Sequence, residues 1–448
     1  MTRAVLGLVL FVAICVGGDP ETCLKLENEG LRHLSTKTPY RIIANKKDSP
    51  VEFKGCTPIK ILGVIRHGTR TPGKKATDEI TERLNNIKNH LRNDFTQDNS
   101  SSKESNKSSK ILCEEDLKNI QRWNFVLESE GEKFLTHEGE DEMIELAERI
   151  SNRFPSLLDR HYDNDTFYFR FTDTQRTRES AKYFTMGLFG RKESKRVWYP
   201  DPIYADPVLR FYKLCSKWRT AVKKNPASKE EMEKLKNSVE SLESCQRISK
   251  RLGLNYTLPY NDVYHIYLAC SFETAWNKYK RSPWCSVFNK KDFKVIEYGE
   301  ELKYYWKDGY GFDINHKQAC PLIHDIFSKL SSDRFNATFY FTHSGTVLKL
   351  LSHLGLYKDE FQLMHDTASK IRSNRKWRVS FIDTFGANVV FVLYRCGDEL
   401  KVLTMHQERI VQVPGCPKGL CPLRLMKEIL VDSIEHCNFT NLCSIQKI

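Results

Sequence analysis

One short stretch near residue 60 constrains the fold more than any other part of the chain. The segment Ile59-Lys60-Ile61-Leu62-Gly63-Val64 is mostly apolar over strand length, which is typical of a buried β-strand. It runs directly into Ile65-Arg66-His67-Gly68-Thr69-Arg70-Thr71-Pro72, where two arginines flank a histidine. Because open α/β sheets bind ligands at the carboxyl ends of their strands, this segment predicts a ligand site in an α/β fold.

The side chains of this loop favour an anionic ligand. Arginine presents a planar fork of donors that matches phosphate oxygens, and histidine can act as a nucleophile near neutral pH. Gly68 allows the backbone to approach a bound group closely, and Pro72 stiffens the exit from the loop. A solvated surface loop with a capping histidine is the alternative, since short motifs also arise by chance.

The loop 66–72 resembles the phosphate-binding loop of the histidine acid phosphatases, and later segments extend this likeness. Segment 171–181 looks like the part of that family that carries a third arginine, here Arg176. The apolar strand 338–342 ends at His343, where the family keeps its second histidine. The likeness runs from about Cys56 to about Cys443 and is closest to the multiple inositol polyphosphate phosphatase branch, with relatives among the phytases. Further segments that share it are 209–215, 282–285, 304–311, 314–315 and 391–396.

The resemblance implies a role for each of these residues. His67 would attack phosphorus and form a covalent phosphohistidine that water then hydrolyses. Arg66, Arg70 and Arg176 would neutralise the phosphate charge, and they would also favour a neutral imidazole by repelling its protonated form. His343 would contact the same phosphate oxygens, although a lone histidine at a strand end is more often structural.

One expected part is missing. The inositol polyphosphate branch follows its second histidine with Ala-Glu, and other branches place Asp directly after it; that carboxyl is the general acid. Here His343 is followed by Ser344 and Gly345, neither of which is a carboxylic acid. A positioned general acid contributes roughly 10² to 10⁴ in rate. Another group therefore protonates the leaving oxygen, or the enzyme is slow on poor leaving groups, or the chain binds phosphates without turnover.

Other chemistries have less support in the sequence. It contains no Walker-type loop, no Gly-x-Ser-x-Gly elbow and no His-Glu-x-x-His pair. His137-Glu138-Gly139 lacks metal-ligand spacing, and Asp163-Asn164-Asp165 is short enough for a turn. We therefore expect no metal requirement and no cofactor.

The N-terminus predicts export. Arg3 precedes a short apolar run, and Val16-Gly17-Gly18 offers a small-residue cleavage site, so residues 1–18 are interpreted as a signal peptide. The run is too short for a membrane span, and the C-terminus carries no retention signal. Six glycosylation sequons agree with secretion; they begin at Asn99, Asn106, Asn164, Asn255, Asn336 and Asn438.

Cysteine usage agrees with an oxidising compartment. The chain has 14 cysteines, and 13 remain once Cys15 leaves with the signal peptide, so one thiol stays free or pairs between chains. Resemblance to the phytases pairs Cys56 with Cys396, Cys270 with Cys285, and Cys416 with Cys421. The partners of the other seven cysteines remain open.

The net charge of +13 indicates a polyanionic partner or a solvated basic surface. The lysines are spread out and no nucleic-acid-binding module is present. A basic cleft that steers a small polyanion accounts for the sign. Lys74 and Lys75, just after the loop, are candidates for contacts to extra phosphates, and they are equally compatible with plain surface lysines.

The pattern along the chain predicts an α/β fold, a mixed sheet flanked by helices, with an inserted and mostly helical domain. Strands are expected at 167–171, 338–342, 379–382 and 389–394, and an amphipathic helix with Thr136 as its N-cap precedes the first of them. The predicted core comprises residues 19–80, 160–199 and 296–448, and the helical insertions are residues 81–159 and 200–295.

Three functions follow from these observations. The first is a secreted phosphomonoesterase that hydrolyses inositol polyphosphates. The second is a secreted protein that captures inositol phosphates or similar polyanions without efficient catalysis, because the proton donor is absent. The third is an acid phosphatase of broad specificity.

Overall fold

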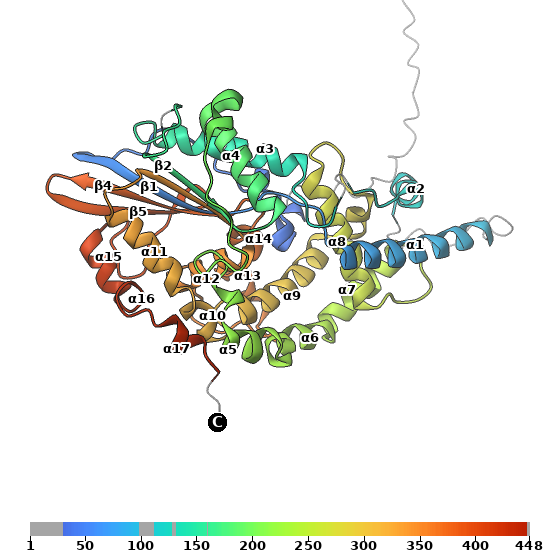
Figure 1. Cartoon of the computed structure of the whole chain (residues 1–448). Helices are drawn as coiled ribbons and strands as arrows, with labels where there is room; N and C mark the ends of the chain where they lie inside the picture. The colour runs from blue at the N-terminus through green and yellow to red at the C-terminus, as the bar shows by residue number, and fades with distance from the viewer. Residues whose placement is uncertain (1–29, 98–111, 128–130, 159, 446–448) are drawn as a thin grey trace, which may run out of the picture.

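The computed structural model describes residues 30–97, 112–127, 131–158 and 160–445. The predicted signal peptide and the sequons at Asn99 and Asn106 lie outside these residues. At one end of the molecule a sheet is covered by helices on both faces, and at the other end helices pack on one another (Figure 1). The predicted mixed sheet with flanking helices is confirmed.

The sheet has seven strands in the order β2-β3-β1-β4-β5-β6, with β7 paired to β5. Strands β1, β2 and β3 are parallel to one another, whereas β4 runs antiparallel to β1 and to β5. The strands are β1 (Cys56–Arg66), β2 (Phe167–Phe171), β3 (Ala337–Thr342), β4 (Asn388–Cys396), β5 (Glu399–His406), β6 (Arg409–Ile410) and β7 (Leu420–Pro422).

Helices make up most of the remaining structure. The first half of the chain contributes α1 (Lys74–Gln97), α2 (Glu114–Arg122), α3 (His137–Arg153), α4 (Gln175–Glu193), α5 (Ser216–Trp218), α6 (Glu230–Lys236), α7 (Val239–Arg251) and α8 (Tyr260–Trp276). The second half contributes α9 (Lys290–Asp308), α10 (Asp313–Lys317), α11 (Cys320–Ser331), α12 (Ser344–His353), α13 (Ser369–Ser373), α14 (Val379–Ile382), α15 (Leu423–Ile429), α16 (Val431–Ile434) and α17 (Phe439–Cys443).

Both faces of the sheet are apolar, and each is buried by its own set of helices. On β1, Ile61 and Ile65 face a core shared with α3 and α4, whereas Leu62 and Val64 face a core shared with α9, α11 and α12. This alternation is the period of two expected of a strand. Because helices cover both faces, the strands read as nearly continuous apolar runs, which is why the sequence revealed them.

A third core lies away from the sheet. It joins α1, α2, α7, α8 and the first turns of α9 around side chains such as Ile80, Ile248 and Ile266. Helix α3 belongs to the sheet instead, since Met143, Leu146 and Ile150 pack in the core that it shares with β1. Its predicted N-cap is confirmed, because the Thr136 side chain accepts a hydrogen bond from Gly139 N. The division into a core and two helical insertions remains our proposal.

One predicted strand is wrong. Residues Val379–Ile382 form the short helix α14 rather than a strand. Val379, Ser380 and Ile382 are buried while Phe381 is half-buried, so burial does not alternate with the period of two of a strand. The β-branched residues suggested a strand. Val379 and Ile382 instead pack in the core that contains Leu62 and Val64, and this tertiary packing outweighed the weak intrinsic preference for a strand.

Disulfides fasten the chain at five places within the described residues. Three pairs match those implied by the family resemblance: Cys56–Cys396, Cys270–Cys285 and Cys416–Cys421. Cys215–Cys443 and Cys320–Cys437 tie the C-terminal helices to the body of the molecule. Cys113 is also disulfide-bonded, and Cys245 is a buried free thiol.

The pairing is open to a direct test. Peptide mapping without reduction should recover these five disulfides. A thiol reagent should label Cys245 only after unfolding, because burial raises the pKa of this thiol to about 11 and keeps it protonated. Labelling of native protein at Cys245, or any of the ten paired cysteines recovered in another pair, would contradict the assignment.

The four predicted glycosylation sites within the described residues have their asparagine at the surface. Asn164, Asn255, Asn336 and Asn438 are exposed. Among the helices that the structure describes, none combines the length and apolar character needed to cross a bilayer.

Candidate active site

The two histidines of the predicted site meet because the strands that carry them are neighbours in register. Arg66, the last residue of β1, pairs with Thr342, the last residue of β3, and His67 N donates to the Thr342 carbonyl at 3.1 Å. His67 and His343 therefore leave the sheet side by side, with ring centroids 5.6 Å apart. The ligand site predicted at the carboxyl end of this strand thus has two imidazoles.

The neighbouring strand β2 supplies the third predicted arginine. Its chain continues past Phe171, with Thr172 N bonded to the Phe341 carbonyl, and then enters α4, whose first turn carries Arg176. An Arg176 guanidinium nitrogen lies 3.3 Å from His343 Nδ1. Three adjacent parallel strands thus deliver the residues that the sequence singled out.

These residues line a cavity of about 300 Å³. Eight cationic side chains line it, namely Lys37, Arg66, Arg70, Arg176, Arg210, Lys213, Lys223 and Lys307. Among the described lining residues Asp308 is the single carboxylate. The cavity is therefore strongly positive and suited to a ligand with several negative charges.

The guanidinium groups have donors to spare for such a ligand. The Nε atoms of Arg66, Arg176 and Arg210 are buried without a hydrogen-bond partner among the described residues. Burial and the neighbouring arginines lower the pKa of Arg70 to about 9 and that of Arg176 to about 10. An anion would relieve both the unsatisfied donors and the mutual repulsion, so the residues present fit a bound phosphate group.

Hydrogen bonding fixes which nitrogen of His67 is available. His67 Nδ1 lies 2.9 Å from the Gly68 carbonyl oxygen, which can only accept, so Nδ1 carries the proton. In the neutral ring this leaves the lone pair on Nε2. His67 is thereby assigned as a neutral imidazole with a free Nε2, the form required of a nucleophile.

We expect His67 to stay neutral in moderately acidic solution. Burial, followed by Arg176, Arg66 and Arg70, holds its pKa well below the usual 6.5. A lowered pKa leaves the basic form populated at pH values below 6.5, so the nucleophile persists there. NMR titration of the ring should place this pKa far below 6.5, and Arg176→Gln should raise it; titration near 6.5 in the wild type would contradict this electrostatic account.

His343 is held in the opposite tautomer. Arg176 can only donate to its Nδ1, so the proton sits on Nε2, which lies 2.9 Å from Thr172 Oγ1. Thr172 in turn bonds Thr177 Oγ1 at 3.1 Å. Burial and the surrounding arginines also hold the pKa of His343 well below its usual value.

The loop carrying His67 lies directly against the start of α3. A Cβ added to Gly68 would lie 2.5 Å from the Gly139 carbonyl oxygen, and one added to Gly139 would lie 2.2 Å from the Thr69 carbonyl oxygen. Only glycine fits at either position. The sequence suggests that Gly68 lets the backbone approach a ligand; in the structure Gly68 packs against the first turn of α3.

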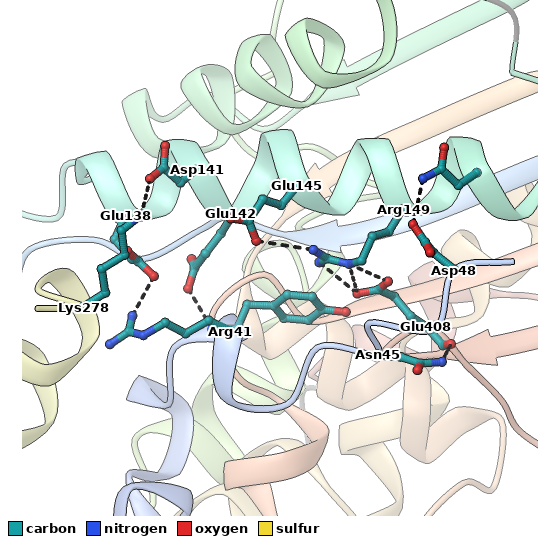
Figure 2. A network of polar contacts seen from close by, with 12 residues as sticks. Arg41, Asn45, Asp48, Glu138, Asp141, Glu142, Glu145, Arg149, Lys278 and Glu408 are labelled. Atoms are coloured by element: carbon teal, nitrogen blue, oxygen red, sulfur yellow. Dashed lines mark hydrogen bonds and ion pairs between the residues drawn. The ribbon is translucent and has the colours of Figure 1, made fainter. Parts of the chain in front are cut away.

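Helix α3 anchors this loop through a buried carboxylate. The Glu142 carboxylate accepts from Thr69 N at 2.7 Å and from Tyr40 N at 2.7 Å. Figure 2 shows Glu138, Glu142 and Arg149 extending from one side of α3 toward the N-terminal segment and Glu408. Glu138 binds Arg41 at 2.6 Å and Arg149 binds Glu408 at 2.9 Å, so one helix connects the loop to two distant segments.

The two lysines proposed for extra phosphates lie outside this cavity. Lys74 and Lys75 are both exposed. Lys75 lines a second cavity of about 580 Å³, together with residues such as Lys303 and Glu300. The two cavities adjoin, because Lys37 of the first bonds Glu300 of the second at 2.6 Å. A role for Lys74 and Lys75 stays a prediction.

Sequence reasoning missed several lining residues. Arg210 lay within a segment that resembles the family, and that segment was the one signal that could have identified it. Lys213 and Lys307 also lie in segments that share the family likeness, 209–215 and 304–311, whereas Lys37 and Lys223 had no local signal. Within the described residues no group of three or more His, Cys, Asp or Glu side chains is arranged to hold a metal ion.

Comparison with known proteins agrees with this geometry. The sequence profile of the histidine phosphatase superfamily, branch 2, matches residues 60–413, and the chain therefore belongs to that superfamily and is a histidine acid phosphatase-type enzyme. More particularly, it is similar to multiple inositol polyphosphate phosphatase 1 of Drosophila melanogaster, at 34% identity over 92% of this chain and 88% of that protein. The Homo sapiens protein of the same name is 26% identical over 88% of this chain and 82% of its own length.

Solved structures show the same fold at lower identity. A phytase from D. castellii superposes with a TM-score of 0.72 at 19% identity, covering 92% of this chain and 87% of that one. The multiple inositol polyphosphate phosphatase of Bifidobacterium longum, in complex with inositol hexasulfate, gives 0.67 at 17% identity, covering 88% and 96%. The predicted histidine-phosphatase architecture is thus confirmed.

Proposed function

We propose that this chain hydrolyses phosphate monoesters of inositol polyphosphates through a covalent phosphohistidine on His67. The observation that carries the proposal is the free Nε2 of a buried neutral histidine among arginines with unsatisfied donors. The names of the relatives add the substrate class, since four of them are multiple inositol polyphosphate phosphatases.

The chemistry proceeds in two displacements. His67 Nε2 attacks phosphorus, the P–N bond forms, and the bond to the leaving oxygen breaks while that oxygen receives a proton. Water then attacks phosphorus, the P–N bond breaks, and inorganic phosphate is released with the imidazole restored. Arg66, Arg70 and Arg176 stabilise the negative charge on the phosphoryl oxygens throughout, which is the largest contribution expected of such a site.

The size and charge of the site support a polyanionic substrate. The phosphoryl group that reacts would occupy the cavity of about 300 Å³. In the adjoining cavity of about 580 Å³, Lys75, Arg83, Lys133 and Lys303 each pair with a carboxylate, and further phosphates would compete with those carboxylates for them. The disulfides and the exposed sequons support passage through the secretory pathway, which we include in the proposal.

Phosphate release from inositol hexakisphosphate by purified protein tests the proposal. We expect release that is inhibited by inositol hexasulfate, a mimic without a hydrolysable phosphate. Release from an aryl phosphate alone would favour an acid phosphatase of other specificity. Binding of the hexakisphosphate without release from any ester would overturn the enzyme and leave a polyanion-binding protein, the function that Ser344 and Gly345 would explain.

A further inference from the structure

Asp308 is an anomaly in a cavity built for anions. It is the single carboxylate among the described lining residues, facing eight cationic side chains. It is almost fully buried, at 3% exposure, at the end of α9. A carboxylate at this position repels a phosphate ligand, which weakens binding. We therefore ask what chemical role would require a carboxyl group there.

The position of Asp308 indicates that role. A Cβ added to Gly345 would lie 3.5 Å from Asp308 Oδ1 and 3.7 Å from the Tyr212 ring. The Asp308 carboxyl group therefore lies in van der Waals contact with the point where a side chain at position 345 would begin. Helix α9 thus places a carboxyl next to the residue two positions after His343, where the related enzymes carry theirs.

Among the described residues, one oxygen of Asp308 has no hydrogen-bond partner. Lys349 of α12, whose side chain is fully buried, holds Oδ1 at 2.5 Å. Oδ2 lies 3.9 Å from Lys307 Nζ, which is beyond hydrogen-bond distance. One oxygen is thereby anchored, and the other is available to carry a proton.

We propose that Asp308 is the proton donor to the leaving oxygen in this chain, in place of the carboxyl absent from positions 344 and 345. This assignment rests on the proposed phosphatase function. As His67 Nε2 bonds to phosphorus and the P–O bond breaks, the proton on Oδ2 passes to the leaving oxygen, and Asp308 becomes a carboxylate beside Lys349. In the second displacement that carboxylate takes a proton from the attacking water, which restores the acid.

Bound substrate supplies the required protonation. Burial by itself raises the pKa of Asp308, but Lys349, Lys307 and Lys303 outweigh it, so in the empty cavity the pKa lies below its usual value. Lys223, Tyr212 and Asp383 also lie within electrostatic range. The negative charges of a polyphosphate disfavour a second anion and raise this pKa, so binding should be coupled to proton uptake by Asp308.

A second carboxyl, Asp383, competes for the role. It is fully buried, accepts a hydrogen bond from Ser344 Oγ, and burial raises its pKa to about 7. It does not line the cavity, and Oδ1 lies 3.7 Å from Arg66, so it serves the arginine behind the phosphate site. A proton from Asp383 would need two transfers through Ser344, whereas Asp308 reaches the cavity directly.

Dependence on the leaving group tests the assignment. An inositol phosphate has an alkoxide leaving group that needs a proton, and an aryl phosphate does not. Asp308→Asn should slow inositol phosphate cleavage by roughly 10² to 10⁴ and change aryl phosphate cleavage far less. Asp313→Asn, which removes an exposed carboxylate on α10, is the matched control and should change neither. Adding Gly345→Glu to Asp308→Ala should restore a proton donor and so reduce the difference in rate between the inositol phosphate and the aryl phosphate.

Two further variants separate the loss of the proton donor from damage to the fold. Asp308→Asn leaves a buried lysine without its partner, so Asp308→Asn combined with Lys349→Met provides a variant without that burden, and the same selective loss is expected. If a folded Asp308→Asn protein loses as much activity on the aryl phosphate as on the inositol phosphate, Asp308 is not the proton donor. The same conclusion follows if Asp383→Asn loses activity on the inositol phosphate alone and Asp308→Asn does not. No release from either ester by wild-type protein instead overturns the proposed function itself.

Proton uptake on ligand binding tests the role of Asp308 without any measurement of catalytic turnover. Calorimetric titration of wild-type protein with inositol hexasulfate, in buffers of different ionisation enthalpy, should show protons taken up on binding. The uptake should fall in Asp308→Asn and persist in Asp313→Asn. Undiminished uptake in a folded Asp308→Asn protein would contradict the assignment.

Discussion

Replacing His67 by alanine should lower phosphatase activity by roughly 10⁴-fold or more, the scale expected when the nucleophile of a covalent mechanism is removed. The residue is 3% exposed, its Nδ1 is engaged by the Gly68 carbonyl, and its Nε2 is left free among three arginines. Rapid quenching of wild-type protein with substrate should trap an acid-labile phosphoprotein, and His67→Ala should not form it.

The control for this experiment is another histidine of the same chain. His90 is exposed on α1, where its ring bonds the Asn86 carbonyl of the same helix and packs edge-on against Tyr256, so His90→Ala should keep both activity and the trapped intermediate. An acid-labile phosphoprotein in His67→Ala, or substantial residual activity, would assign the attack to a different group.

The second large effect concerns the arginines, which should act as a unit. Arg176→Ala should lose roughly 10² to 10³ in rate, because it removes a donor aimed at the developing charge. Arg178 lies on the same helix but is exposed and pairs with Glu179, so Arg178→Ala should remain close to wild type. Arg176 is a cleaner test than Arg66, whose removal also leaves buried Asp383 without its cation.

The losses should not add. Arg176 helps to lower the pKa of Arg70, and the two would hold one phosphoryl group between them. The double variant should therefore lose less than the product of the two single losses. Kinetics on an aryl phosphate measure this without a demand for a proton donor. Normal activity in Arg176→Ala would remove the third arginine from the site, and strictly multiplicative losses would separate the roles of the two residues.

Local pattern predicted much of the sheet. The apolar runs of β1, β2, β3 and β4 are visible in the sequence because helices bury both faces, so their apolar character does not depend on their partners. The same reasoning failed for Val379–Ile382, where four residues are too few to separate the two periods and tertiary packing decided for a helix.

The sequence by itself determined the chemical parts: a strand ending in Arg66-His67, a second ending at His343, and the absence of a carboxyl after it. These are local facts, written in adjacent residues. Only the tertiary structure decided that Arg66 and Thr342 stand in register, that Arg210 and Lys37 line the cavity, and that Asp308 lies beside Gly345. Those contacts join residues that are far apart in the chain. They depend on strand order and helix packing, which no local pattern of residues encodes.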